Sequence, residues 1–540
     1  MPDYQLFWGD SHTNLHLRGA EPAEVAGARV APPAGEQHTN LPAETMADLD
    51  AALAHARQVL DFWPIAYYPY TYVERNGFRE ECWRAEDDVD ACWRAVCDLA
   101  AAASRDEELI VFPGYEWQGD CRHGDHNVFF YDSPAPILRS RTLPELYAEI
   151  RRRGLRAMAI PHHTAYRVGV RGKDWSVHDE RLSPFAEVFS NHGCSESDEE
   201  WIGLRKNWHM GPGASGGSIE DGLARGLRLG IVASTDAHYG IPAVWGQGLM
   251  GCWAERLTRE ALWEAFGERR VYGVTGDRIE LRFGVEGAAM GQVIRRAGPV
   301  RCEAGARGGD AIDRIELLRN NRVIATHCHS GTWDVPPAGE RTRWKLRVEV
   351  GWGPKSVDIP EKAPREWACC LDVPDGAVVA AEPCWKTAGQ WIGELGGSAC
   401  EFGFRTTQGP PHGGVPTEAT VFEIDARPED RVTINLGGRI VSMTLAEAAG
   451  ASRLMDSMDE VRRHVRRVHG LDPDALERND RIYFYGHKAK LHRAIPQAGF
   501  EAKLAHVDAD PPPGRNHYRV RVTQRNGQAA WSSPVWVDNG

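Results

Sequence analysis

The chain has 540 residues, of which 42% are hydrophobic and 26% are charged, a composition typical of folded globular proteins. This length exceeds what one ordinary hydrophobic core holds, and it predicts two or three domains. The formal net charge of -13 disfavours nonspecific binding to nucleic acid or to an anionic membrane, because both are themselves polyanions.

The cysteines and the first residues of the chain favour a cytoplasmic location. The twelve cysteines follow no regular framework, and Cys369 and Cys370 are adjacent, which is typical of reduced thiols. The first predicted strand begins within a few residues of Met1, which leaves no space for a secretion signal. No apolar stretch is long enough to span a bilayer. We therefore expect a cytoplasmic protein.

Up to about residue 278, short apolar runs alternate with helical patterns, which predicts βα units and a mostly parallel sheet. Val89, Trp93 and Val96 recur at helical spacing, and Thr142 with Glu145 forms a capping box that begins another helix. The expected elements are strands at 6–8, 109–112, 157–160 and 229–234, and helices over 86–103, 142–154 and 219–227.

Beyond residue 278 the apolar pattern changes to a period of two, which predicts an antiparallel β-sandwich. Hairpins are expected to turn at Asn320 and Asn321 and at Asn526 and Gly527. The segment 351–415, rich in Gly, Pro, Cys and Trp, is expected to form loops, and 443–469 to form a helical insertion. These patterns predict a domain over 1–278 and a second domain over 279–540. Three roles for the second domain stay open from the sequence: binding carbohydrate, covering one side of the barrel, or mediating homo-oligomerisation.

Carboxylates and imidazoles recur at the ends of the predicted strands. Because the carboxyl ends of the strands of a βα barrel meet at one rim, these side chains are expected to converge on a polynuclear metal site. Imidazole with carboxylate suits manganese, iron or zinc, and the absence of thiolates removes the strongest bias toward zinc. The residues are Asp10 and His12 in GDSH, Glu116 in FPGYEW, His126 in GDHNVFF, His162 and His163 in IPHH, and Asp236 and His238 in ASTDAH.

In this order and at these separations, the motifs resemble those of the PHP (polymerase and histidinol phosphatase) superfamily. The resemblance is greatest to a long bacterial PHP-like branch with a C-terminal β-sandwich, and it covers nearly the whole chain. It implies a distorted βα barrel that holds up to three divalent metals, usually for phosphoester hydrolysis. It further implies that His12, Glu116 and Asp236 hold the first metal, that Glu116, His126 and His162 hold the second, with Glu116 as the bridge, and that His238 belongs to the third.

Two departures from the family pattern reduce the expected number of metals. The first motif usually has a second histidine where this chain has Asn14, and the second motif usually has an Asp-His pair where this chain has Tyr67 and Tyr68. The imidazole of the third metal is therefore missing, which favours a site with one or two ions, and we expect two. His16 either compensates for this loss or contacts the substrate.

Several candidates have two open roles. Asp10 either ligates a metal directly or orients His12. His163 is expected to contact the metal ligands or the substrate. Either His163 or one of the two tyrosines is expected to protonate the leaving group. Tyr67 and Tyr68 either serve in this way or pack as aromatic residues at strand ends often do.

Substrate recognition is expected in the loops that follow the ligand-bearing strands. One such loop carries Tyr166, Arg167, Arg171 and Lys173, and the stretch EVFSNHGCSE carries Glu187, His192 and Glu196. Exposed basic residues are mostly solvated, but an arginine fork matches phosphate, and Arg167 is the expected anion contact. The predicted substrate contacts are Arg167, His192, Glu196, His16 and Asn14.

These features predict a metal-dependent hydrolase. Two divalent ions that share a carboxylate lower the pKa of a bound water and clamp the attacking and leaving oxygens. The expected activity is that of a phosphoesterase on a small-molecule ester. The Asn14, Tyr67 and Tyr68 departures keep open a hydrolase or lyase of C–O or C–N bonds, acting on glycosides, amides or lactones. A non-catalytic scaffold or ligand-binding protein is the third alternative.

Overall fold

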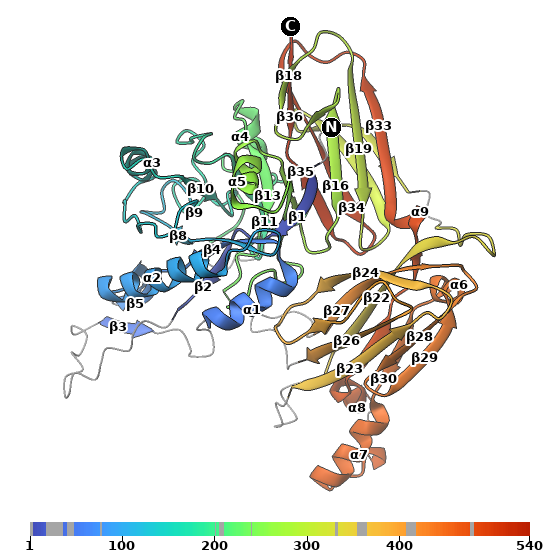
Figure 1. The fold of residues 1–540 in the computed structure, drawn as a ribbon. Coiled ribbons are helices and arrows are strands. Elements are labelled where there is room, and N and C mark those ends of the chain that lie inside the picture. The colour runs from blue at the N-terminus through green and yellow to red at the C-terminus, as the bar shows by residue number, and fades with distance from the viewer. Residues whose placement is uncertain are drawn as a thin grey trace, which may run out of the picture.

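The structure is a computed structural model in which the elements form three groups (Figure 1). The N-terminal part carries most of the longer helices, and the C-terminal part forms two sets of sheets, one containing β16, β19 and β33 to β36 and one containing β22 to β30. The residues described are 4–17, 36–39, 48–75, 78–199, 201–204, 210–238, 240–329, 333–353, 364–406, 417–475 and 480–540.

The largest sheet has 15 strands among the described residues and runs from the N-terminal part into the C-terminal part. The crossing point is the pairing of β15 (Val271–Val274) with β35 (Ala529–Ser532). The order is β10 (Ala157–Pro161), β9 (His126–Phe130), β8 (Gly114–Trp117), β4 (Phe62–Tyr67), β1 (Gln5–Gly9), β14 (Leu249–Ala254), β15, β35, β34 (Gly514–Gln524), β20 (Ile312–Arg319) and β21 (Arg322–Cys328), with β2 (Thr13–Leu15) and β7 (Ile110–Phe112) on β4 and with β36 (Val535–Asn539) joining β34 to β18 (Val293–Arg295).

The expected α/β class is confirmed in its coarse form, but the N-terminal strands are mixed rather than mostly parallel. β4 pairs in parallel with β1, β7 and β8, whereas β8 with β9, β9 with β10 and β1 with β14 are antiparallel. The loop 118–125 joins β8 to β9 without a crossover helix, and a parallel pair requires a longer connection. This short link explains why β9 runs antiparallel to β8.

The predicted N-terminal helices are present, and the Thr142–Glu145 capping box is confirmed. Two small sheets accompany them, one of which carries part of the candidate site. The helices are α1 (Leu49–Val59), α2 (Glu86–Ala103), α3 (Leu143–Arg152), α4 (Ile219–Ala224) and α5 (Arg259–Gly267); the small sheets are β12 (Gly193–Cys194) with β11 (Phe185–Ser190) and β13 (Gly230–Ala233), and β3 (Glu36–Thr39) with β5 (Tyr70–Arg75) and β6 (Phe78–Trp83).

The C-terminal part contains three further sheets, each built from antiparallel pairs. Both predicted hairpin turns are confirmed, between β20 and β21 and between β34 and β35. The sheets are β17 (Ala288–Ala289), β16 (Glu280–Val285), β19 (Val300–Arg307) and β33 (Glu501–Asp508); β24 (Ala377–Cys384), β27 (Thr417–Ala426), β22 (Thr342–Gly351), β31 (Lys488–Leu491) and β30 (Arg453–Asp456), with β32 (Ile495–Pro496) on β22; and β25 (Trp391–Ile392), β26 (Ala399–Thr406), β23 (Arg365–Asp372), β28 (Arg431–Leu436) and β29 (Arg439–Thr444).

Two expectations for this part need correction. The segment 351–415 is not a loop region where it is described, because it contains β23, β24, β25 and β26, while 354–363 and 407–416 lie outside the described residues. Its Trp and Cys side chains conceal the alternation of a strand with one buried face. The helical insertion at 443–469 is two helices, α6 (Leu445–Gly450) and α7 (Met458–His469), separated by β30; α8 (Asp480–Tyr485) and α9 (Gln497–Phe500) follow.

The main apolar core is continuous between the N-terminal and C-terminal parts. Tyr67 and Val274 belong to the same buried cluster as Trp344 and Val520. All twelve cysteines have free thiols. Among the described helices, none combines the length and the apolar character needed to cross a membrane.

Candidate metal centre

The loop after β1 is fixed to the loop after β13 by one buried carboxylate, that of Asp10. Its Oδ1 accepts hydrogen bonds from the backbone N–H groups of His12 and Thr235, both at 3.1 Å. Its Oδ2 accepts from the hydroxyls of Thr13, at 2.6 Å, and Thr235, at 2.7 Å. These donors occupy both oxygens, so Asp10 holds the backbones that carry His12 and Asp236 in place, the second of its two predicted roles.

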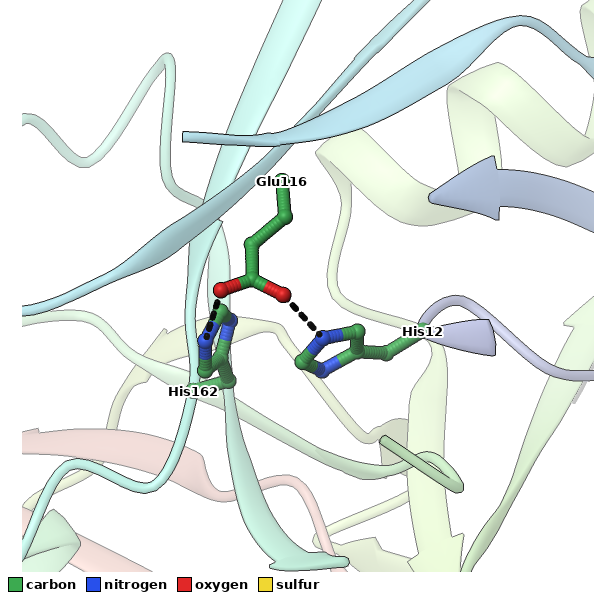
Figure 2. Close-up of side chains that lie close together, drawn as sticks. All are labelled: His12, Glu116 and His162. Carbon is green, nitrogen blue, oxygen red and sulfur yellow. Dashed lines mark ion pairs between the residues drawn. The ribbon is translucent and has the colours of Figure 1, made fainter. Parts of the chain in front are cut away.

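His12, Glu116 and His162 lie together at the centre of the site (Figure 2). The Glu116 carboxylate, on β8, faces both rings: its Oε2 is 3.6 Å from Nε2 of His12, and its Oε1 is 3.9 Å from Nε2 of His162. The ring centroids of the histidines are 4.1 Å apart. All three side chains are buried, and one carboxylate faces two imidazoles, which is an arrangement suited to a metal ion.

The orientation of His12 is set by carboxylates on both sides of its ring. Nδ1 lies 3.1 Å from Oε2 of Glu187, on β11, and donates to it, so that Nε2 faces Glu116 and Oδ1 of Asp236, at 3.4 Å. Burial by itself lowers the pKa of His12, but the carboxylates of Asp236, Glu116 and Glu187 outweigh it and raise the pKa well above its ordinary value. Without a metal, His12 is therefore the positive charge that these carboxylates share.

The ligand cluster continues on the far side of Asp236 and His162. Nε2 of His192 is 3.1 Å from Oδ2 of Asp236, and together with His163 these residues form a second group able to hold a cation. Nε2 of His163 is 3.6 Å from Oδ2 of Asp125, and these two with His162 form a third group. These groups are joined through His162 and His163, so the potential ligands form one connected cluster.

The residues of this cluster fit a divalent cation. Both ring nitrogens of His162 are buried and have no hydrogen-bond partner among the described residues. Burial, reinforced by the neighbouring imidazoles, lowers the pKa of His162 well below its ordinary value, so the ring is neutral and able to ligate. A buried imidazole without a hydrogen-bond partner costs free energy, and a bound metal ion would remove that cost.

His126 does not join the cluster in the way that the family resemblance implies. Its Nδ1 donates to the carbonyl of Gly124 at 2.9 Å, and its Nε2 is 3.3 Å from Nζ of Lys173. It belongs to no group of three potential ligands found among the described residues, whereas the preceding Asp125 does. In the structure, Asp125 and not His126 contributes to the site from this motif.

Asn14, His16 and His238 form the more open edge of the site. Nδ2 of Asn14 donates to Oδ1 of Asp236 at 3.0 Å and lies 3.3 Å from Nε2 of both His12 and His238. Nδ1 of His238 is 2.8 Å from Nε2 of His16. The His238 side chain is 24% exposed, whereas the side chains of His12 and Asp236 are buried.

The two tyrosines at the end of β4 face opposite directions. The Tyr68 hydroxyl donates to Glu81 and accepts from Nε2 of Gln118 at 3.1 Å, and the Tyr68 ring lies 4.5 Å from that of His16. Tyr67 instead lies in the hydrophobic core with Cys92 of α2, where burial raises its pKa. Only Tyr68 adjoins the site, as expected from the alternation of side chains along a strand.

The predicted substrate contacts also separate into two sets. Arg167 is exposed, and the arginine that reaches the site is Arg171, whose NH1 donates to Oδ2 of Asp125 at 2.6 Å and whose NH2 donates to Glu81. His192 lies among the ligands, but Glu196 is buried in ion pairs with arginines of β34. Glu196 is therefore not placed to contact a substrate.

Four members of the overlapping ligand groups were not assigned a metal-binding role from the sequence: Asp125, Glu187, and also His163 and His192, which were expected to touch the substrate or to protonate the leaving group. The signal for Glu187 is a carboxylate inside the apolar strand FAEVFS, where a buried charge needs a partner. Asp125 gives a weaker signal, because it stands beside a histidine that the family motif favours.

Comparisons with known proteins give limited similarities. The model of a family described as "Protein of unknown function (DUF3604)" matches residues 234–293, which begin just before Asp236. An uncharacterised protein of Chlamydia pneumoniae is 32% identical over 263 residues, 43% of this chain, and the chain spans about 40% of the length of that relative. A solved two-domain protein of Bacteroides vulgatus, described as containing a predicted PHP-like metal-dependent phosphoesterase, is 12% identical with a TM-score of 0.33, over 59% of this chain and 80% of that one.

Proposed function

We propose that this protein is a metal-dependent hydrolase with a PHP-type barrel site for two divalent ions, acting on a small-molecule phosphate ester. The observation that carries the proposal is the His12–Glu116–His162 group, in which one carboxylate faces two imidazoles and both ring nitrogens of His162 are buried without a hydrogen-bond partner among the described residues. Bound divalent ions would supply a water of lowered pKa and an electrophilic clamp on the ester oxygens.

In this proposal, residues of the chain orient the metal ligands and protonate the leaving group. Glu187 holds Nδ1 of His12, which leaves Nε2 directed at the site, and Asp10 fixes the two loops that carry His12 and Asp236. The Tyr68 O–H, next to His16 at the open edge, is the group we assign to protonate the leaving oxygen. His163 lies deeper, within the ligand groups, and in this proposal it binds metal rather than the departing group.

The net charge of -13 supports a small substrate rather than a nucleic acid or a membrane surface. The free cysteines support a cytoplasmic protein. Manganese, iron and zinc each suit the imidazole and carboxylate ligands.

One observation favours a second candidate, a hydrolase or lyase of C–O or C–N bonds in a neutral substrate. Arg171 reaches the site, but its guanidinium is already bound to the carboxylates of Asp125 and Glu81. A phosphate would then have to rely on the metals for its positive partners, whereas a lactone, amide or glycoside would not.

The test combines elemental analysis with a substrate panel. The purified full-length protein, supplied with manganese, iron and zinc, should retain about two ions per chain and hydrolyse phosphate esters. His162→Ala should lose both properties, whereas His55→Ala, which alters a buried histidine on α1 outside the site, should keep them. Activity on lactones, amides or glycosides alone would select the second candidate, and a chain without bound metal would overturn both.

A further inference from the structure

The β11–β12 hairpin carries His192 at its turn, and the carboxylate of Glu196 follows shortly after β12. Three donors from the C-terminal strands surround this buried carboxylate. Oε1 accepts from NH1 of Arg519 at 2.5 Å, and Oε2 accepts from NH1 of Arg521 and from Nε1 of Trp531, both at 2.9 Å. Glu196 and Arg519 are separated by 323 residues in the chain.

Arg519 connects Glu196 to a second element of the N-terminal part. Its NH2 donates to Oε1 of Glu220, on α4, at 2.7 Å, and its side chain has no exposed surface. The backbone N–H of Glu220 also donates to the carbonyl of Glu196 at 3.0 Å. The guanidinium therefore fixes the segment after β12 to the start of α4.

The hairpin transmits this anchoring to the metal centre. Phe189 pairs with Cys194 and Ser190 with Gly193, so that only Asn191 and His192 form the turn. The indole of Trp531 stacks on Phe189. A hairpin closed by two residues has little freedom, so the position of Glu196 constrains the position of the turn.

At the turn, His192 is held between the site and a buried tyrosine. Its Nε2 is 3.1 Å from Oδ2 of Asp236, and its Nδ1 is 3.0 Å from the hydroxyl of Tyr166. The hairpin thus has a ligand group at one end and an anchor formed by side chains of β34 and β35 at the other.

We propose that Arg519 and Arg521 are positioning residues of the metal centre, which act through Glu196 and the β11–β12 hairpin on His192. The inference rests on the proposed metal-dependent function, and it makes β34 and β35 a functional part of the site. Arginine suits this role because its fork fixes a carboxylate in direction as well as in distance.

The test measures metal affinity in the full-length protein. Arg519→Met should weaken manganese or zinc binding by about 10- to 100-fold, the usual effect of losing a group that orients a ligand. Arg515→Met is the matched control, since Arg515 lies on the same strand, is 45% exposed and pairs with Asp538. It should leave the affinity unchanged. If Arg519→Met does not fold, Glu196→Gln, which keeps the shape of the side chain, carries the same expectation.

A double-mutant cycle separates positioning from simple stabilisation. Once His192→Ala has removed the ligand, adding Arg519→Met should weaken metal binding no further, because both changes act on the same group. Additive losses, or an unchanged affinity in Arg519→Met, would overturn the inference while leaving the proposed function intact. An unsubstituted protein that binds no metal would overturn the proposed function, and the inference with it.

Discussion

Carboxylates are buried in two regions of this molecule, and they meet different partners there. In the candidate metal centre they face imidazoles, as Glu187 faces His12. Burial raises the pKa of Glu187, although the hydrogen bond and the charge of His12 lower it in part. At the contact between the N-terminal and C-terminal parts they face guanidinium groups. There Arg519 and Arg521 outweigh the effect of burial and lower the pKa of Glu196 to about 2.

The Asp277 cluster makes the contrast sharper. The potential ligand atoms of Asp277, Glu382 and Cys384 lie as close together as those of the metal centre. However, Oδ1 of Asp277 accepts from Trp245 at 2.9 Å and lies 3.5 Å from NH1 of Arg347, so the chain itself supplies the cation. Proximity of ligand types alone does not define a metal site; the candidate metal centre differs from the Asp277 cluster because both ring nitrogens of His162 lack a hydrogen-bond partner among the described residues.

The largest expected effect is on catalysis, in Glu116→Gln. Removing the carboxylate between His12 and His162 should abolish metal retention and lower the rate by about a thousandfold, equal to roughly 4 kcal/mol in the barrier. The unfolding free energy without metal should change by no more than about 1 kcal/mol, because His12 keeps Glu187 and Asp236 as partners. Elemental analysis, turnover and denaturation measure these quantities. A variant that keeps its metal would remove Glu116 from the site.

In the Asp277 cluster, loss of the cation should lower stability and leave metal binding unchanged. Arg347→Met leaves the Asp277 carboxylate buried without its guanidinium, and the unfolding free energy should fall by about 3–5 kcal/mol. Metal content should not change. Arg343→Met is the control on the same strand, since Arg343 is 37% exposed and pairs with Asp425; it should cost less than about 1 kcal/mol. Equal losses in the two variants would mean that the Asp277 cluster does not depend on its cation.

The third prediction concerns the loss of stability at low pH. The folded-state pKa of Glu196 is about 2, below its ordinary value of 4.5, so its ion pairs stabilise the protein above that ordinary value. This contribution, about 3 kcal/mol from the size of the shift, should be lost as the pH falls from about 4.5 toward 2. Denaturation measured across this pH range should show that the difference in unfolding free energy between the unsubstituted protein and Glu196→Gln decreases as the pH falls. A difference that does not vary with pH would contradict the assignment.

The sequence predicted the features that local patterns encode. The apolar spacing gave α2 its limits, the capping box marked the start of α3, and Asn526 with Gly527 marked a hairpin. His12 and Glu116 could be found because each stands at or beside the end of a short apolar run.

Features that depend on direction or on distant partners could not be predicted in the same way. Asp125 and His126 are neighbours at the start of β9, and the sequence does not state which of them faces the site. The pairing of Glu196 with Arg519 joins positions 323 residues apart, and an arginine in an alternating strand resembles a solvent-exposed one. The antiparallel pairing of β8 with β9 depends on how the loop 118–125 folds back, which the apolar pattern does not encode.

The smallest expected effect separates the two tyrosines at the end of β4. Tyr68→Phe removes a hydroxyl that accepts from Gln118, whose amide also donates to Glu116, and turnover should fall about tenfold, equal to roughly 1.4 kcal/mol. Tyr67→Phe alters a hydroxyl in the core beside Cys92, and turnover should stay unchanged. Steady-state kinetics of both variants, on the substrate that the panel identifies, measure the difference. Unchanged turnover in Tyr68→Phe would show that its hydroxyl takes no part in the reaction, and the proton for the leaving group would then have to come from the His16–His238 pair at the open edge.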